Sequence, residues 1–321
     1  MPEKSKLKHF ITPMLATTVD KPFNNDEWLF ELKLDGYRAI AELNTKKNLL
    51  YSRNGLDLEN KYPSLTQDLK RNKKSMILDG EIVVLDNKGR TDFQKLQNYG
   101  DNKEFPLVYY VFDILHIGKK DLKNTTLFER KKILKQELNV FSSVLYCDHI
   151  ENNGEDFFDA VKAKDMEGIM AKKKDSLYYP GIRTKQWLKI KNHKSQEAVI
   201  VGFTEPKGSR RCFGSLLLAQ YNKNKLQYIG HVGTGFTDKI LNEVIRKMRP
   251  LIIKNSLFDE YIKPNNAVTW IKPLLVAEVG YSEITKDGIL RHPIFKGLRA
   301  DKQAKKITKE AEQIVPASKT T

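Results

Sequence analysis

Apolar and polar residues alternate in short runs along the first part of the chain, a pattern typical of strands that bury one face. A helical pattern interrupts these runs at Leu127–Leu138, where Leu127, Leu134 and Leu138 would lie on the same face of a helix. Strands in meandering order with inserted helices predict an α+β domain built on antiparallel sheets. The predicted strands are Trp28–Lys33, Tyr37–Leu43, Leu49–Ser52, Met76–Leu85, Leu107–His116, Gly168–Lys172 and Trp187–Lys191.

The pattern changes after the polar stretch Asn192–Glu197, which we interpret as a hinge. Five or so strands with a single helix in ~110 residues are typical of a small closed barrel such as an OB-fold. We therefore expect a first domain at residues 1–192, a barrel at residues 193–306 and a polar tail at residues 307–321. The predicted elements are strands at Ala198–Thr204, Gly214–Tyr221 and Lys225–Val232, a strand-rich stretch from Thr269 to Ile284, and a helix with Ile240, Leu241, Val244, Ile245 and Met248 on its inner face.

The segment ELKLDGYR, residues 31–38, combines a strand with a turn signal. Glu31 and Lys33 alternate with two leucines, and Asp35-Gly36 then predicts a hairpin whose return strand begins at Tyr37. By itself the pattern favours an ordinary hairpin with Lys33 on its polar face. A functional role for Lys33 therefore depends on the rest of the chain.

Composition narrows the class of protein. The 321 residues suit two domains, and 40% hydrophobic with 30% charged residues is a soluble globular balance. The net charge of +16 favours a polyanionic partner such as nucleic acid, although a general surplus of surface lysine would give the same number. Two distant cysteines exclude a cysteine-rich zinc module and favour a reducing cytoplasm, and no apolar run approaches the ~18 residues of a membrane span.

Charged residues recur inside apolar strands of the first domain. Each alone is compatible with a strand rim or a solvated face. Together they indicate a shared polar cleft, because an unpaired charge inside a strand costs several kcal/mol. These residues are Arg53, Glu81, Asp113, Glu167, Lys189 and Lys191.

The chemistry of these side chains matches a nucleoside triphosphate with Mg²⁺. Glu81 and Glu167 suit a divalent metal or ribose hydroxyls, and Phe112 offers a face to a purine ring. The cations that suit phosphates are Lys33, Arg38, Arg53, Lys189 and Lys191. No phosphate-binding G-x-x-x-x-G-K-[ST] or G-x-G-x-x-G loop is present. A lysine beside other cations loses affinity for its proton, so Lys33 becomes a candidate nucleophile that attacks the α-phosphate.

The order of the motifs resembles the covalent nucleotidyltransferase superfamily, and within it the ATP-dependent DNA ligases. The matching motifs are Lys33-Leu34-Asp35-Gly36-Tyr37-Arg38, Ser52-Arg53-Asn54-Gly55, Asp79-Gly80-Glu81, Phe112-Asp113, Glu167–Lys172 and Leu188–Lys191. Four further stretches are similar to the ligase domain of bacterial end-joining (LigD-type) ligases, namely Pro13–Ala16, Tyr179–Thr184, Gly230–Phe236 and Arg291–Lys302.

The resemblance implies a nucleotidyltransferase domain of ATP-grasp-like type followed by a C-terminal OB-fold barrel. It implies Lys33 as the catalytic nucleophile, Glu81 and Glu167 as metal ligands for Mg²⁺ or Mn²⁺, and the barrel residues Arg299, Asp301 and Lys302 as the group that orients the leaving pyrophosphate. The implied ATP-binding residues are Glu31, Lys33, Arg38, Arg53, Glu81, Phe112, Met170, Arg183, Lys189 and Lys191.

The implied activity is the sealing of 5′-phosphate/3′-hydroxyl nicks in duplex DNA, in repair or recombination. We expect nicked duplex DNA as substrate, a Ku-type end-binding protein as a partner, a monomer, and no membrane association. An RNA ligase or an mRNA-capping guanylyltransferase would use the same lysine chemistry and remain alternatives. A basic OB-type binding protein is the non-enzymatic alternative, and it leaves the charges inside the strands unexplained.

Overall fold

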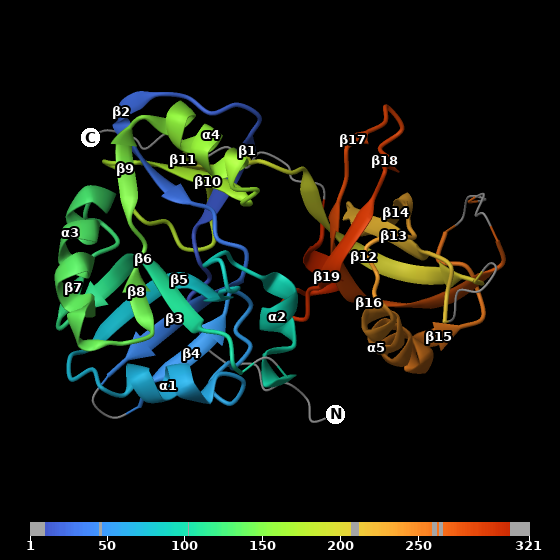
Figure 1. The fold of residues 1–321 in the computed structure, drawn as a ribbon, viewed down its shortest axis with the longest axis horizontal. Coiled ribbons are helices and arrows are strands. Elements are labelled where there is room, and N and C mark those ends of the chain that lie inside the picture. The colour runs from blue at the N-terminus through green and yellow to red at the C-terminus, as the bar shows by residue number, and fades with distance from the viewer. Residues whose placement is uncertain are drawn as a thin grey trace. The chain divides into compact units, whose positions relative to one another are not determined.

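The structure is a computed structural model that describes residues 10–44, 47–101, 103–206, 212–258, 262 and 266–308. The chain divides into two compact units, with the boundary between Asn192 and His193. Figure 1 labels the elements of both units. Among the described residues, no helix has the length and apolar character needed to cross a membrane.

The first unit contains two sheets, and the first of them has one apolar face and one polar face. Its strands, in sheet order, are β1 (Leu15–Val19), β11 (Arg183–Lys191), β10 (Gly168–Lys173), β2 (Asn25–Leu32) and β9 (His149–Asn152). Helix α4 (Gly154–Ala163) covers one face (Figure 1), where Val161 packs with the buried residues Phe30, Ile169 and Ile190. The alternation of side chains leaves the opposite face for polar residues.

The second sheet of this unit carries the larger core. Its path is β4 (Leu49–Ser52), β3 (Tyr37–Leu43), β5 (Met76–Val84), β6 (Leu107–Ile117) and β7 (Lys120–Asp121), and β8 (Val144–Tyr146) also pairs with β6. The helical segments beside it are α1 (Pro63–Leu69), α2 (Phe93–Gln97), η1 (Tyr99–Asp101), α3 (Leu127–Glu137) and η2 (Leu138–Val140). Leu65, Phe93 and Leu134 from the three α-helices join its buried cluster.

The second unit is the OB-fold domain. Its main sheet has the order β14 (Lys225–Val232), β13 (Leu216–Asn222), β12 (Ser195–Thr204), β16 (Val268–Gly280) and β15 (Ile252–Ile253), and β19 (Ile294–Leu298) also pairs with β16. Register shifts interrupt β12 between Ile200 and Gly202, where bulges bend strands as a barrel requires. The other elements are α5 (Asp238–Met248), η3 (Arg249–Leu251), the two-stranded pair β17 (Glu283–Ile284) and β18 (Leu290–Arg291), and η4 (Ala304–Lys306).

Most predicted strands are confirmed, and three agree at both ends, namely Tyr37–Leu43, Leu49–Ser52 and Lys225–Val232. The α+β class is confirmed, but the sheets of the first unit are not purely antiparallel. The pairs β1–β11 and β6–β8 are parallel. The predicted strands of the first unit did not include β1, β7, β8 or β9, which are short and lie at or beside sheet edges.

The predicted hairpin at Asp35-Gly36 is wrong. Strand β2 pairs with β10 and β9, whereas β3 pairs with β4 and β5. Residues 33–36 therefore lead from one sheet to the other. Gly36 is required by space, because a Cβ there would lie 2.2 Å from the carbonyl oxygen of Ile82.

The predicted hinge is too long. Ser195, Gln196 and Glu197 pair with Gly280, Val279 and Glu278 in β12–β16, so only the start of the polar stretch connects the units. At the other end, Ile307 is buried and its carbonyl accepts a hydrogen bond from the Tyr221 amide at 2.8 Å. The rest of the predicted tail, residues 309–321, lies outside the described residues.

Candidate active site

The polar face of the first sheet is built in register. Glu31 on β2 lies opposite Met170 on β10, and Met170 lies opposite Lys189 on β11. Residues paired across neighbouring strands share a face, so these three predicted ATP-binding residues lie together. Lys191 is opposite Gly168 and continues the same row toward the end of β2.

Lys33 follows directly after β2, at the start of the crossover between the sheets. Its amide donates a hydrogen bond to the Gly168 carbonyl at 2.9 Å. Its Nζ donates to Oε1 of Glu167, forming an ion pair. Gly168 has φ of 142°, and a Cβ at this position would lie 2.1 Å from the Ile190 carbonyl oxygen. Only glycine therefore allows Glu167 and Lys33 to approach in this way.

The electrostatic surroundings of Lys33 differ from the expectation. Burial by itself would lower the pKa of Lys33, but Glu167, Asp35 and Glu81 outweigh burial and raise that pKa above its usual value. The expectation that neighbouring cations lower the pKa of Lys33 is therefore wrong for this state. The reason is that the charges acting on Lys33 are mainly those of carboxylates, while Arg38 is itself paired with Asp79.

Arg38 on β3 joins the two sheets. Its Nε and Nη2 donate to the two oxygens of Asp79 on β5 at 3.0 and 2.7 Å, and its Nη1 donates to the Met14 carbonyl at 2.7 Å. The Tyr178 hydroxyl donates to the same Asp79 carboxylate at 2.7 Å. Glu81 is opposite Arg38 in the β3–β5 register, which brings this predicted metal ligand to the same place.

Aromatic rings and a buried charge cluster lie next to Arg38. Phe112 on β6 and Trp187 on β11 make an edge contact with ring centroids 6.2 Å apart. The Nζ of Lys172 lies 4.0 Å from the centroid of Phe112 and 4.3 Å from that of Trp187. Lys172 is 2.6 Å from one oxygen of Glu31, and Lys131 on α3 is 2.6 Å from the other. Glu31 is thus held by two lysines beside the predicted adenine platform.

The remaining predicted residues lie at strand ends around this region. Arg53 follows β4, and its amide donates to the Arg38 carbonyl at 3.1 Å. Arg183 begins β11, and its Nη1 donates to the Ala16 carbonyl. Lys189 is opposite Thr18 of β1 as well as Met170.

One of the charges inside the strands has a structural role. Asp113 and Arg130 are both fully buried, and Arg130 donates Nε and Nη2 to the two Asp113 oxygens at 2.7 and 2.8 Å. Asp113 therefore anchors α3 to β6, and its inclusion among the cleft charges is a correction to the sequence interpretation. Its partner, Arg130, lies on α3, and the residue pattern of strand β6 gives no information about a contact with a helix.

The predicted site residues did not include four buried neighbours, namely Lys131, Lys172, Asp79 and Tyr178, although Asp79 and Lys172 lie within the quoted motifs. Lys131 and Lys172 pair with Glu31, Asp79 pairs with Arg38, and the Tyr178 hydroxyl donates to Asp79. Lys172 had a usable signal, because it lies two positions after Met170 and so shares its face. Lys131 and Tyr178 had none, since a helix and a loop bring them in.

The carboxylates of Glu81 and Glu167 supply some, but not all, of the ligands that a divalent cation requires. The Oε2 atom of Glu167 is buried without a hydrogen-bond partner, which leaves it available as a ligand. Within the described ranges, no group of three or more histidine, cysteine, aspartate or glutamate side chains is arranged to hold a metal. This set fits Mg²⁺ that is bound by one or two carboxylates together with substrate phosphates.

The second unit holds its own charge cluster. Arg299 donates Nε and Nη2 to the Asp301 carboxylate, both at 2.9 Å, and lies 3.7 Å from Glu278. Lys302 is 2.6 Å from Glu197. Burial would raise the pKa of Asp301, but Arg299 and Lys302 outweigh burial and lower it to about 2. The three predicted pyrophosphate-orienting residues therefore lie together.

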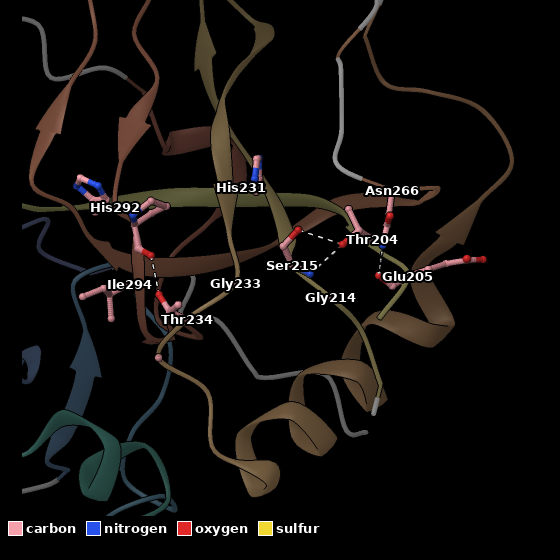
Figure 2. A pocket seen from close by; sticks show the side chains of 12 residues that line it. Thr204, Glu205, Gly214, Ser215, His231, Gly233, Thr234, Asn266, His292 and Ile294 are labelled. Atoms are coloured by element: carbon pink, nitrogen blue, oxygen red, sulfur yellow. Dashed lines mark hydrogen bonds between the residues drawn. The ribbon is translucent and has the colours of Figure 1, made fainter. Parts of the chain in front are cut away.

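A groove of about 790 Å³ opens on the second unit. Figure 2 shows Thr204 and Ser215 side by side in its lining, with their hydroxyls 3.0 Å apart. The Thr234 hydroxyl, also in the lining, donates to the Pro293 carbonyl at 2.9 Å. Gly214, Gly233 and Gly235 line it without side chains. The groove contains none of the predicted site residues.

Comparison with known proteins identifies the protein family to which this fold and site belong. The family model described as "ATP dependent DNA ligase domain" matches residues 13–191, and the model described as "ATP dependent DNA ligase C terminal region" matches residues 209–302. The chain belongs to the ATP-dependent DNA ligase family.

Particular relatives refine this assignment. The multifunctional non-homologous end joining protein LigD of Pseudomonas aeruginosa is 35% identical over 316 residues, covering 96% of this chain and 37% of that protein. The Mycobacterium tuberculosis counterpart, strain H37Rv, is 36% identical and covers 94% of this chain and 40% of that protein. The chain thus spans about two fifths of these relatives.

A solved structure agrees with this assignment. The structure titled "mycobacterial DNA ligase D complexed with ATP and MES" superposes with a TM-score of 0.68 at 34% identity, covering 94% of this chain and 98% of that one. The likeness extends over both units of the present chain.

Proposed function

We propose that this chain seals 5′-phosphate/3′-hydroxyl nicks in duplex DNA through a covalent Lys33–AMP intermediate. The observation that carries the proposal is the position of Lys33, where the crossover between the sheets meets Glu167, Glu81 and the Arg38–Asp79 pair. We also propose functional domains at residues 1–192 and 193–306.

The first step forms the intermediate. Deprotonated Lys33 Nζ attacks the α-phosphorus of ATP, a phosphorus–nitrogen bond forms, and the bond to the β-phosphate breaks to release pyrophosphate. Lys189, Lys191 and Arg53 supply positive charge for the phosphoryl oxygens. Phe112, Glu31 and Met170 form the region for the base, and Arg183 completes the binding set.

The next steps transfer AMP and seal the strand. An oxygen of the 5′-phosphate attacks the Lys33-bound phosphorus, and the phosphorus–nitrogen bond breaks to return the lysine amine. The 3′-hydroxyl then attacks the 5′-phosphorus, joins the strand and releases AMP. Arg38 is proposed to contact phosphate in these steps.

Glu81 and Glu167 would hold Mg²⁺ or Mn²⁺, which would neutralise charge developing on the phosphates. The unpartnered Oε2 of Glu167 supports this role. Arg299, Asp301 and Lys302 would orient the leaving pyrophosphate. We further propose a monomer that acts in the cytoplasm on the nucleoid, with a Ku-type end-binding partner. The names of the LigD relatives support an end-joining role.

The test is a sealing assay on nicked duplex DNA with ATP, with GTP, and with RNA at either side of the nick. Sealing with ATP on DNA supports the proposal. Labelling by GTP in preference to ATP would indicate a guanylyltransferase, and sealing confined to RNA strands would indicate an RNA ligase.

A further inference from the structure

Exposed cations gather at one end of the second sheet of the first unit, away from the candidate active site. We name this set the basic end. It contains Lys47, Lys70, Arg71, Lys73, Lys74, Lys119 and Lys120, all of which are exposed.

Hydrogen bonds bring these residues together from three segments. Residues 70–74 follow α1, and the Gly118 amide of the β6–β7 turn donates to the Ser75 carbonyl at 2.8 Å. The Asn48 side chain donates to the Leu69 carbonyl at 3.2 Å, which places the segment containing Lys47 beside the end of α1. Lys119 lies in the turn that Gly118 anchors, and Lys120 begins β7 directly after it. The cations therefore share one end of the sheet.

The backbone that carries the cations is fixed. Asp68, which is buried in α1, accepts hydrogen bonds from the amides of Ser142 and Ser143 at 2.9 and 2.6 Å and from both hydroxyls at 3.1 and 2.7 Å. The Arg71 amide donates to the Asp68 carbonyl at 3.0 Å, so this anchor continues into the basic turn. Lysines on a fixed backbone lose less entropy when they bind than lysines on a mobile segment.

Positive charge exceeds negative charge at the basic end. Arg71 lies 3.4 Å from Asp68 and Lys74 lies 2.7 Å from Glu137, whereas Lys73, Lys119 and Lys120 form no ion pair within the described part of the chain. Glu59 lies near enough to interact with Lys47 and Lys70. The acids thus offset only part of the charge.

The composition of this surface favours nucleic acid over protein. None of the large hydrophobic side chains exposed in the described structure belongs to residues 47, 70–74 or 117–120, whereas protein interfaces centre on aromatic and apolar side chains. Amide and hydroxyl groups from Asn72 and Ser142 lie among the cations. Lysine, arginine, asparagine and serine together are the usual contacts of a phosphate backbone.

The length of strand β5 gives the distance between the basic end and the candidate active site. Lys74 lies just before β5, and Glu81, whose charge acts on Lys33, lies seven residues further along. At about 3.3 Å per residue this separation is at most roughly 23 Å. Roughly six to seven base pairs of duplex, at about 3.4 Å each, span the same length.

We propose that the basic end binds the phosphate backbone of one duplex arm about six to seven base pairs from a nick held at Lys33. The inference rests on the proposed ligase function and adds a second contact that sets how much duplex the enzyme needs. The contact is independent of base sequence, because it involves phosphates alone.

The experiment compares the full chain with a variant carrying Lys70→Gln, Lys73→Gln, Lys119→Gln and Lys120→Gln. A matched control carries Lys132→Gln, Lys135→Gln, Lys162→Gln and Lys164→Gln, which removes the same charge from exposed positions in α3, in α4 and directly after α4. Affinity for nicked duplex is measured from about 50 to 200 mM salt, with either arm shortened in turn. Labelling by α-labelled ATP is measured in parallel.

We expect the variant to bind long-armed nicked DNA at least about tenfold more weakly and with a salt slope shallower by about 3. We expect this deficit to disappear when one of the two arms is cut below about six base pairs, and AMP labelling to stay unchanged. The inference would be overturned by an unchanged salt slope, by an equal loss of affinity in the control, or by a loss of affinity that does not depend on arm length. Wild-type protein that binds DNA through the basic end yet never seals a nick would instead reject the proposed function.

Discussion

Lys33 meets two requirements that act on its pKa in opposite directions. A nucleophile must lose its proton, yet Glu167 and the nearby carboxylates outweigh burial and raise the pKa of Lys33. The same carboxylate that stabilises the charged lysine has a buried oxygen available for a metal ion. We propose that the ion pair holds Lys33 in position until ATP binds, when a divalent metal held by Glu167 would offset the negative charge that raises the lysine pKa.

The Glu167→Gln substitution should make Lys33 reactive at lower pH. Removing the negative charge removes the main influence that raises the lysine pKa, so burial then dominates and the neutral amine appears earlier as pH rises. The measurement is the rate of modification by an amine reagent against pH, without ATP or metal, with Lys33 located by peptide mass spectrometry. A midpoint that stays in place or moves to higher pH would show that Glu167 does not control the lysine.

At the scale of elements, the crossover at residues 33–36 connects the two halves of the candidate site. The crossover is short and passes close to β5. A Cβ added to Gly36 would lie only 2.2 Å from the Ile82 carbonyl oxygen. A side chain there would push the crossover away from β5. Lys33 would move with it.

The Gly36→Ala substitution should therefore reduce AMP labelling by about 10²-fold, the scale of loss expected from a misplacement near 1 Å. The second unit should unfold at an unchanged temperature, since Gly36 belongs to the first unit. Gly100→Ala is a useful control, because it tests a glycine of the same unit that has open space around it and no left-handed backbone. Wild-type labelling in Gly36→Ala would contradict the tight crossover.

Helix α3 depends on the Asp113–Arg130 ion pair, in which both side chains are fully buried. Arg130→Met should lower the free energy of unfolding of the first unit by about 3 to 5 kcal/mol, because Asp113 would be left charged and unpaired. The double variant Asp113→Asn/Arg130→Met should recover part of that loss. Denaturant unfolding provides the measurement, and a loss below about 1 kcal/mol in the single variant would contradict a dominant role for the pair.

At the scale of the whole molecule, the sequence predicts strands better than it predicts their partners. The sequence predicted both ends of β3, β4 and β14, because turn-forming residues such as Gly36, Gly55 and Asn224 lie near those ends. The same local pattern could not reveal that β2 and β3 belong to different sheets, since pairing depends on distant segments. The motif residues were likewise visible, whereas Lys131 and Tyr178 reach the site only through tertiary packing.

The two units should contribute to different steps. Replacing Arg299 and Lys302 by alanine removes the charges proposed to orient pyrophosphate, so formation of lysine–AMP should slow by at least about tenfold. Sealing of a nick supplied with AMP already on its 5′-phosphate should change much less. Equal losses in both assays would indicate that the cluster with Asp301, Glu197 and Glu278 serves only to hold the second unit together.

The covalent attachment of AMP to Lys33 is the step on which the proposed ligase activity depends. A direct test incubates the protein with α-labelled ATP and a divalent metal, and compares wild type, Lys33→Ala and the exposed-lysine control Lys132→Ala. We expect label on wild type and on Lys132→Ala, with the AMP located on Lys33 by peptide mass spectrometry, and none on Lys33→Ala. Label retained by a folded Lys33→Ala protein would contradict this expectation.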